Sequence, residues 1–93
     1  MYKVILAHEY RKSLKKIKKS GKYFGIEKKV NKIVGIIASG EKLNKKYQDH
    51  KLKGCMSEYR ECHIKSNLLL IYKKDNKNLV LLLINVGSHD DLF

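Results

Sequence analysis

The sequence is poor in acidic residues, cysteines and phenylalanines, and it has no long apolar run. Its 93 residues include nine Asp and Glu against 21 Lys and Arg, so the formal net charge is +12. A charge of this size opposes compaction and favours association with a polyanion, such as nucleic acid, an anionic membrane face or an acidic protein. A lysine-rich surface that binds nothing is the alternative interpretation of the same composition.

These scarcities limit the compartment and the classes of site. No apolar run approaches the length of a membrane span, and the start MYKVILAHEY has too short an apolar stretch for a signal peptide. We therefore expect a cytoplasmic protein without a membrane partner. Two cysteines, Cys55 and Cys62, agree with a reducing compartment, and their odd spacing would put them on opposite faces of one strand. His50 and His63 lie nearby, but a CxxC motif is lacking, so we expect no metal and no cofactor.

The apolar pattern along the chain predicts one strand, two helices and three further strands. The helices are expected at residues 8–19 and 26–38, where apolar side chains recur at helical spacing and a glycine follows the last turn. The expected strands cover residues 2–6, 55–64, 68–74 and 79–85. We predict a single α+β domain over residues 1–93, with a two-helix hairpin packed on one face of an antiparallel sheet of about four strands. The other face is left open for a ligand.

A long loop separates the helices from the last three strands. Residues 40–54, GEKLNKKYQDHKLKG, are polar and rich in lysine, with Leu43, Tyr47 and Leu52 as isolated apolar anchors. Loops of this length in small domains are often functional. Between the last two strands, DNKN at 75–78 predicts a tight turn, because Asn and Asp tolerate the left-handed conformation that a reversal requires.

Three of the four histidines lie in the second half of the chain. His50 lies in the long loop, His63 near the end of the first meander strand, and His89 after the last strand. Neighbouring strand ends can bring His63 and His89 together, with the loop adding His50. Imidazole titrates near neutral pH, so it is the side chain best suited to exchange protons there. Three unrelated surface or capping histidines are the alternative.

Basic side chains accompany these histidines. Arg60 is a candidate phosphate clamp, because a guanidinium donates two parallel hydrogen bonds to a phosphate. Pairing with a neighbouring acid is its other interpretation. Lys51, Lys53 and Lys65 flank two of the histidines, although lysines are abundant throughout the chain.

The last residues combine two acids with a scarce aromatic. Phe93 is one of two phenylalanines in the chain. It is expected either to plug the sheet edge or to stack on a nucleic-acid base. Asp90 and Asp91 are unusual beside an RNA-binding surface, and pairing with nearby lysines is expected to hold the tail in place.

Three segments, YQDHKLKG, YRECHIKSNLLLIYKK and GSHDDLF, follow one another in the second half of the chain. In that order they resemble the YafQ branch of the RelE/ParE superfamily of bacterial type II toxins. The lysine-rich helices match this family only in pattern. The resemblance implies a RelE-like fold and a ribosome-dependent mRNA endoribonuclease, an mRNA interferase that inhibits translation. It also implies two partners, a cognate acidic antitoxin and mRNA on the ribosome.

The resemblance also assigns roles to individual residues. Four positions match the family's site: His50, His63, His89 and Phe93. Asn67 stands where an aspartate is usual, and Asn85 stands where an arginine is expected. Both are retained as candidates for RNA or phosphate binding. The histidines that would transfer protons therefore match the family, whereas two of the residues that would stabilise charge do not.

Cleavage by the 2′-hydroxyl of RNA needs a base, an acid and cationic donors for the charge on the phosphate. We assign His50 and His89 to proton transfer without deciding which is the base. His63 orients the phosphate or shares one role, and Arg60 and the loop lysines supply positive charge. One alternative is a protein of the same fold that binds RNA, ribosome or antitoxin without efficient cleavage. Another is a ParE-like toxin acting on gyrase, against which the histidines and Phe93 argue.

Overall fold

The order of elements follows the predicted one, with two short turns, a short strand and a final helical turn added. The structure is a computed structural model and describes residues 1–93. In chain order the elements are β1 (Lys3–Leu6), α1 (His8–Ser20), α2 (Ile26–Ala38), the 3₁₀ turn η1 (Lys45–Tyr47), β2 (His50–Lys51), the 3₁₀ turn η2 (Gly54–Met56), β3 (Arg60–Lys65), β4 (Leu68–Asp75), β5 (Val80–Gly87) and α3 (His89–Leu92). The predicted α+β class is confirmed.

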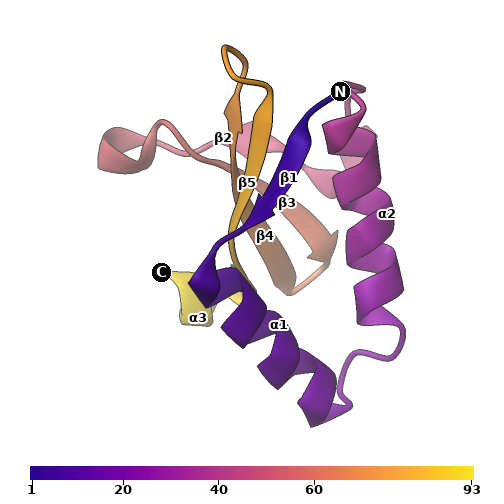
Figure 1. The fold of residues 1–93 in the computed structure, drawn as a ribbon. Coiled ribbons are helices and arrows are strands. Elements are labelled where there is room, and N and C mark those ends of the chain that lie inside the picture. Colours follow the sequence, from indigo (N-terminus) through magenta and orange to yellow (C-terminus); the bar gives the residue numbers. More distant parts are fainter.

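The sheet has five strands in the order β1-β5-β4-β3-β2 and is mixed (Figure 1). β1 pairs in parallel with β5, whereas β5, β4, β3 and β2 are antiparallel neighbours. The predicted antiparallel meander is therefore present, and β1 and β2 extend it at its two edges. β1 can run parallel to β5 because the long chain between them, which includes both helices, allows the return that a parallel pair needs.

The hydrophobic core lies between the two long helices and one face of the sheet. α2 buries the apolar stripe that its sequence predicts, and α1 adds the buried Tyr10. The sheet side of the core consists of Cys62, Ile64, Leu68, Leu70, Tyr72, Leu81, Leu83 and Val86. Neighbouring residues on β3 and β4 face the opposite side, because successive strand side chains alternate. Each large buried side chain contributes about 1.5–3 kcal/mol, so this layer holds the helices in place.

The two long helices form an open V instead of a closely packed pair (Figure 1). α1 ends at Gly21, whose left-handed φ of 67° lets its N–H donate to the carbonyl of Lys18. Across the turn, the Lys18 ammonium lies 2.6 Å from the carboxylate of Glu27. The predicted helical hairpin is thus present in a splayed form, in which each helix packs on a different part of the sheet.

β3 begins later in the chain than the sequence predicts. The strand expected from residue 55 begins at Arg60, because Gly54 adopts a left-handed φ of 70° and starts the turn η2. Cys55 is therefore exposed in that turn, while Cys62 is buried in β3, and both are free thiols. They do not share a strand, so their alternation cannot be what keeps them apart.

The long loop and the DNKN turn position the ends of the meander. Within the loop, η1 and the two residues of β2 are regular. The DNKN turn is confirmed, because Asp75 accepts hydrogen bonds of 3.0 Å from the N–H groups of Lys77 and Asn78.

No helix of the structure has both the length and the apolar character needed to cross a membrane.

Candidate functional site

His50 lies at the edge of the sheet in β2. Its Nδ1 lies 2.6 Å from the carbonyl oxygen of Gln48. A carbonyl can only accept a hydrogen bond, so Nδ1 carries the proton and donates it. The other ring nitrogen, Nε2, points toward Glu61 and lies 3.6 Å from its Oε1. His50 therefore presents Nε2 as the nitrogen that is free to exchange a proton.

Glu61 stands between two of the predicted histidines. Its Oε1 lies 3.6 Å from Nε2 of His50 and 3.8 Å from Nε2 of His63. Both distances are longer than a hydrogen bond, so each contact becomes an ion pair only when the imidazole is protonated. Glu61 is the only buried charged residue in the chain, at 6% exposure. Glu61 is not among the site residues predicted from the sequence, although its position two residues before His63 in a predicted strand puts it on the same face.

The short helix α3 begins at His89, and Phe93 is its C-cap. Ser88 caps it, because its Oγ accepts from the N–H of Asp91 at 3.2 Å and its N–H donates to the Asp91 carboxylate at 3.1 Å. The hydrogen bonds from Ser88 lower the pKa of Asp91. The ring centroids of His89 and Phe93 are 5.1 Å apart with a 40° interplanar angle. Asp91 thus holds the tail mainly through the cap, and the expected pairing with lysines is a minor charge effect of Lys16 and Lys22.

Gly87 allows α3 to fold back on the end of β5. A Cβ at this position would lie 3.1 Å from the Cβ of Asp91 and 3.5 Å from Leu92. The capped turn therefore packs closely against the backbone of Gly87. This explains why the terminal segment needs a glycine, a serine and an acid around its histidine.

These elements enclose a pocket of about 300 Å³. Its lining consists of His50, Lys51, Leu52, Lys53, Glu61, His89 and Phe93. The structure thus brings two of the three predicted histidines and two of the predicted lysines to one place. His63 does not line the pocket, but its Nε2 lies 3.8 Å from the lining carboxylate of Glu61, and 24% of its side chain is exposed. The pocket can offer ring nitrogens, two ammonium groups and a carboxylate to a ligand that also meets an aromatic ring.

Arg60 does not share this pocket. It faces the other side of β3 from Glu61, because neighbouring strand residues alternate. Its Nε and Nη2 each donate to Asp49 at 3.3 Å, and the Tyr72 hydroxyl donates to the same carboxylate. Partial burial lowers the pKa of Arg60, but hydrogen bonding and the charge of Asp49 outweigh it, so the net pKa is raised. The structure pairs Arg60 with Asp49, the alternative interpretation of its sequence, and Arg60 does not line the histidine pocket.

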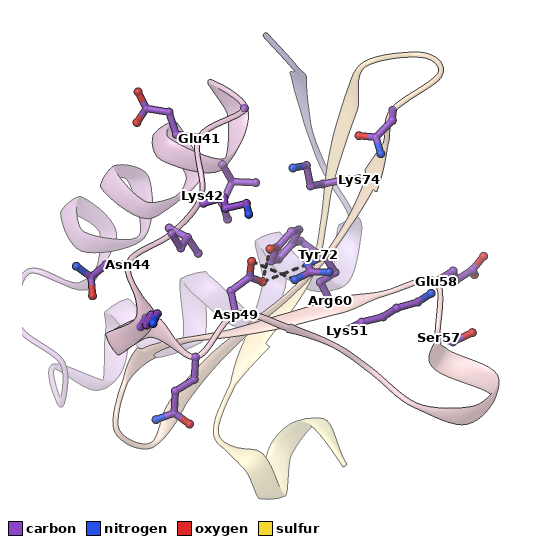
Figure 2. Close-up of a pocket in the computed structure, with 16 residues that line it drawn as sticks. Glu41, Lys42, Asn44, Asp49, Lys51, Ser57, Glu58, Arg60, Tyr72 and Lys74 are labelled. Atoms are coloured by element: carbon purple, nitrogen blue, oxygen red, sulfur yellow. Dashed lines mark hydrogen bonds and ion pairs between the residues drawn. The ribbon is translucent and has the colours of Figure 1, made fainter.

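Arg60, Asp49 and Tyr72 lie in a second, larger groove of about 830 Å³ (Figure 2). The loop after α2, the end of β4 and the segment before β3 form its walls. Lys51 lines both this groove and the histidine pocket. The larger groove is not the candidate site, because the candidate proton-transfer groups lie in the smaller pocket.

Three other predicted residues lie outside the pocket lining. Asn85 accepts hydrogen bonds on its side-chain oxygen from the Ser13 hydroxyl at 2.6 Å and from the N–H of Val86 at 2.9 Å. It therefore ties β5 to α1. Asn67 is exposed in the turn between β3 and β4. The Lys65 ammonium lies 5.8 Å from the centroid of the Tyr23 ring, toward the turn between the long helices.

A mixed sheet with two helices on one face and a histidine pocket at the end of the other agrees with the RelE-like fold that the sequence motifs imply. Residues 2–93 match the family described as "Bacterial toxin of type II toxin-antitoxin system, YafQ". The chain belongs to this family, and the resemblance seen in its sequence motifs is confirmed. A comparison with curated proteins gave no match.

Solved structures of similar proteins agree with this assignment. A metal-bound toxin from Helicobacter pylori is 38% identical, with a TM-score of 0.89 and 100% of both chains covered. A mutant YafQ from Escherichia coli is 26% identical, with a TM-score of 0.85, and covers 100% of this chain and 99% of its own. A chain of the Escherichia coli DinJ-YafQ toxin-antitoxin complex is also 26% identical, with a TM-score of 0.85 and coverage of 99% and 97%.

Proposed function

We propose that this chain is a toxin that cleaves mRNA on the ribosome, an mRNA interferase with acid–base histidines. The observation that carries the proposal is the meeting of His50 and His89 in one pocket with Lys51, Lys53 and Phe93. Residues 39 positions apart in the sequence supply two imidazoles to the same small space. An RNA phosphate that enters it meets groups of the kinds that strand cleavage requires.

In the proposed reaction the 2′-oxygen of the RNA attacks the adjacent phosphorus, and the bond to the 5′-oxygen of the next nucleotide breaks. Nε2 of His50 takes the proton of the 2′-hydroxyl, and His89 gives a proton to the departing 5′-oxygen. The products are a 2′,3′-cyclic phosphate and a free 5′-hydroxyl. The Glu61 carboxylate, 3.6 Å from Nε2, stabilises the imidazolium that forms on His50. The proton that His50 holds on Nδ1 supports its role as the base, because it leaves Nε2 as the acceptor, and His89 is proposed for the remaining role of acid.

The pocket lysines and Phe93 complete the proposed site. Lys51 and Lys53 line the pocket and supply the positive charge that the phosphate needs as negative charge accumulates in the transition state. Phe93 is 53% exposed and contacts the His89 ring, so a base can stack on its free face. His63, behind Glu61, is proposed to orient that carboxylate.

The second candidate function is binding of RNA, ribosome or antitoxin by a protein that cleaves RNA only slowly. Asn85 stands where an arginine was expected, and its side chain bonds to Ser13 of α1. This position therefore adds no cation to the pocket. Under this alternative the chain binds RNA, ribosome or antitoxin and arrests growth without efficient cleavage.

The proposed partners are mRNA on the ribosome and an acidic antitoxin. A related YafQ chain occurs in a complex with DinJ, and the net charge of +12 favours an acidic partner segment. We propose that such an antitoxin occurs for this chain as well.

The test is cleavage of a defined message, with and without ribosomes, mapped at the 5′ ends of the products. His50→Ala and His89→Ala should each lower the rate about a hundred- to ten-thousand-fold, because each removes one proton-transfer group. His8→Ala is the matched control, because this exposed histidine begins α1 and lies outside the pocket. Parent-like rates in both pocket variants would overturn the assignment. Ribosome binding without cleavage by the parent would favour the second candidate.

A further inference from the structure

We propose that Asp49 is the positioning residue for His50, and that Arg60 and Tyr72 hold Asp49 in place. Its effect on rate rests on the function proposed above, whereas its effect on the His50 ring does not. Asp49 immediately precedes His50, and Figure 2 shows its carboxylate pointing at the Arg60 guanidinium and the Tyr72 hydroxyl. We call these three residues the clamp. It lies in the larger groove, and it orients a histidine of the smaller pocket.

The clamp consists of three hydrogen bonds to one carboxylate. Arg60 Nε and Nη2 donate to the two oxygens of Asp49 at 3.3 Å each, and the Tyr72 hydroxyl donates to Oδ1. Two parallel bonds from one guanidinium fix direction as well as distance. Burial raises the pKa of the Tyr72 hydroxyl and the Asp49 charge raises it further, so this group stays protonated and remains a donor.

The two donors stand on a rigid base. Arg60 and Tyr72 are direct partners across the β3–β4 ladder, so their side chains leave the sheet side by side on the same face. Tyr72 is 1% exposed and belongs to the hydrophobic core. The clamp therefore holds Asp49, a loop residue, in a fixed position relative to β3 and β4.

The segment that carries His50 has little regular structure of its own. β2 has only two residues and lies at the edge of the sheet. Gln48 adopts a left-handed φ of 50°, a conformation that is costly for a residue with a Cβ. The carbonyl of this same residue accepts the Nδ1 proton of His50 at 2.6 Å. Two ladder partners on β3 hold the backbone of β2, and the bonds to Asp49, the residue between the two ends of this turn, add a side-chain anchor.

Anchoring Asp49 restrains His50 because the two residues are adjacent in the chain and their side chains reach two different sites. Asp49 lines the larger groove and His50 lines the smaller pocket. With Asp49 clamped, the His50 ring keeps its bond to Gln48 and its Nε2 faces Glu61. Without the clamp, the strained turn relaxes and the ring loses its single orientation.

The experiment compares Asp49→Asn and Tyr72→Phe with the parent and with Glu58→Gln. Glu58 is the matched control, because it is an exposed carboxylate of the same groove that pairs with Lys73 at 3.4 Å. Nitrogen-detected NMR of the histidine rings near pH 8 reads the tautomer of a neutral imidazole. We expect His50 to be protonated on Nδ1 in the parent and in Glu58→Gln. In both clamp variants its signals should move to the mixed-tautomer positions of a free histidine.

A rate measurement accompanies the spectra. Asp49→Asn should lower kcat for message cleavage about a hundredfold, the effect of misplacing a reacting group by about 1 Å. KM should change little, because the pocket lysines that bind phosphate are untouched. A purely structural role would lower the folded fraction and leave the His50 tautomer of the remaining folded chains unchanged.

Each outcome decides the proposal. Unchanged His50 signals in both clamp variants overturn it, whether or not the chain cleaves RNA. Changed signals together with a parent that does not cleave support the positioning role and overturn the proposed nuclease function instead. Equal changes in Glu58→Gln overturn it as well, because any lost groove charge would then suffice. Tyr72→Phe removes one hydroxyl without altering shape, so it keeps the test intact if Asp49→Asn does not fold.

Discussion

Glu61 gives the histidine pocket its buried negative charge. The carboxylate reaches His50 and His63 from one oxygen, at 3.6 and 3.8 Å. A buried carboxylate next to a histidine stabilises the imidazolium that forms when the ring accepts a proton. At the scale of single residues, the proposed base therefore depends on a neighbouring buried carboxylate as well as on its own ring.

Replacing Glu61 by glutamine should weaken the proposed base. Glu61→Gln keeps the size of the side chain but removes the charge, so the His50 imidazolium loses its partner. We expect the cleavage rate at neutral pH to fall about a hundredfold, the lower range for losing a general base. Single-turnover cleavage of ribosome-bound message measures this. Glu58→Gln, at an exposed carboxylate, should cleave at the parent rate, and an equally fast Glu61→Gln enzyme would remove Glu61 from the mechanism.

The sequence was informative for residues whose role is local and misleading for residues whose partner is distant. His50, His89 and Phe93 stand in short motifs, and the structure brings them to one pocket. Arg60 was expected at the phosphate because its chemistry allows it. Its partner, Asp49, is 11 residues away, and their meeting depends on how the loop folds over β3. Side-chain type alone does not contain that information.

At the scale of elements, α3 is a single capped turn that carries two candidate site residues. Its stability comes from the Ser88–Asp91 capping box and the close approach to Gly87. Such a short helix has little stability of its own, because nucleation is costly and few bonds follow it. The geometry of His89 and Phe93 therefore depends on the cap.

Removing the cap should release α3 while the rest of the fold remains. Ser88→Ala loses the side-chain acceptor, a change that costs about 1 kcal/mol at helix N-termini. In the parent, the pKa of Asp91 is lowered by Ser88. The bond from the Ser88 N–H to the Asp91 carboxylate therefore stabilises α3 fully above the unfolded pKa of Asp91, and this stabilisation is lost as the pH falls through the lower folded pKa.

The contact between the His89 and Phe93 rings is the readout, followed as a nuclear Overhauser effect. We expect it to be present in the parent at neutral pH, to weaken on acidification, and to be weak in Ser88→Ala at both pH values. Ser20→Ala is the control, because that serine bonds to the end of α1. A strong ring contact in Ser88→Ala at neutral pH would show that packing on Gly87 suffices without the cap.

Elements with a strong local pattern were predicted well, and elements made by pairing were not. α2 follows from its apolar stripe, and its bounds agree with the prediction. β2 has two residues and forms only because His50 and Lys51 find partners on β3. The parallel partner of β1 comes from the far end of the chain. A two-residue strand such as β2 has no periodic pattern of its own, and no window near β1 contains its partner.

At the scale of the whole molecule, positive charge is mostly unpaired. Only Lys18, Arg60 and Lys73 have a carboxylate within ion-pair distance, out of 21 lysines and arginines. The other side chains keep their charge in solvent, where each is free to meet a phosphate or an acidic residue. The excess therefore acts through association and contributes little to holding the fold together.

Binding of RNA should consequently fall steeply with salt. Each neutralised phosphate releases counterions, and a protein that contacts about six phosphates loses on the order of a thousandfold in affinity between about 50 and 200 mM salt. Affinity for a short single-stranded RNA, measured at several salt concentrations with His89→Ala to prevent cleavage, gives the slope. Lys53→Gln should lower the slope by about one contact.

Lys77→Gln serves as the control for location, because this exposed lysine lies in the turn between β4 and β5, which Figure 1 shows at the end of the sheet remote from α3. If RNA binds at the histidine pocket, the control keeps the parent slope while Lys53→Gln does not. Equal slopes for the two variants would mean that RNA is held by the diffuse charge of the whole surface. A salt-independent affinity would mean that phosphates are not what this basic chain binds, and the net charge would then need another partner.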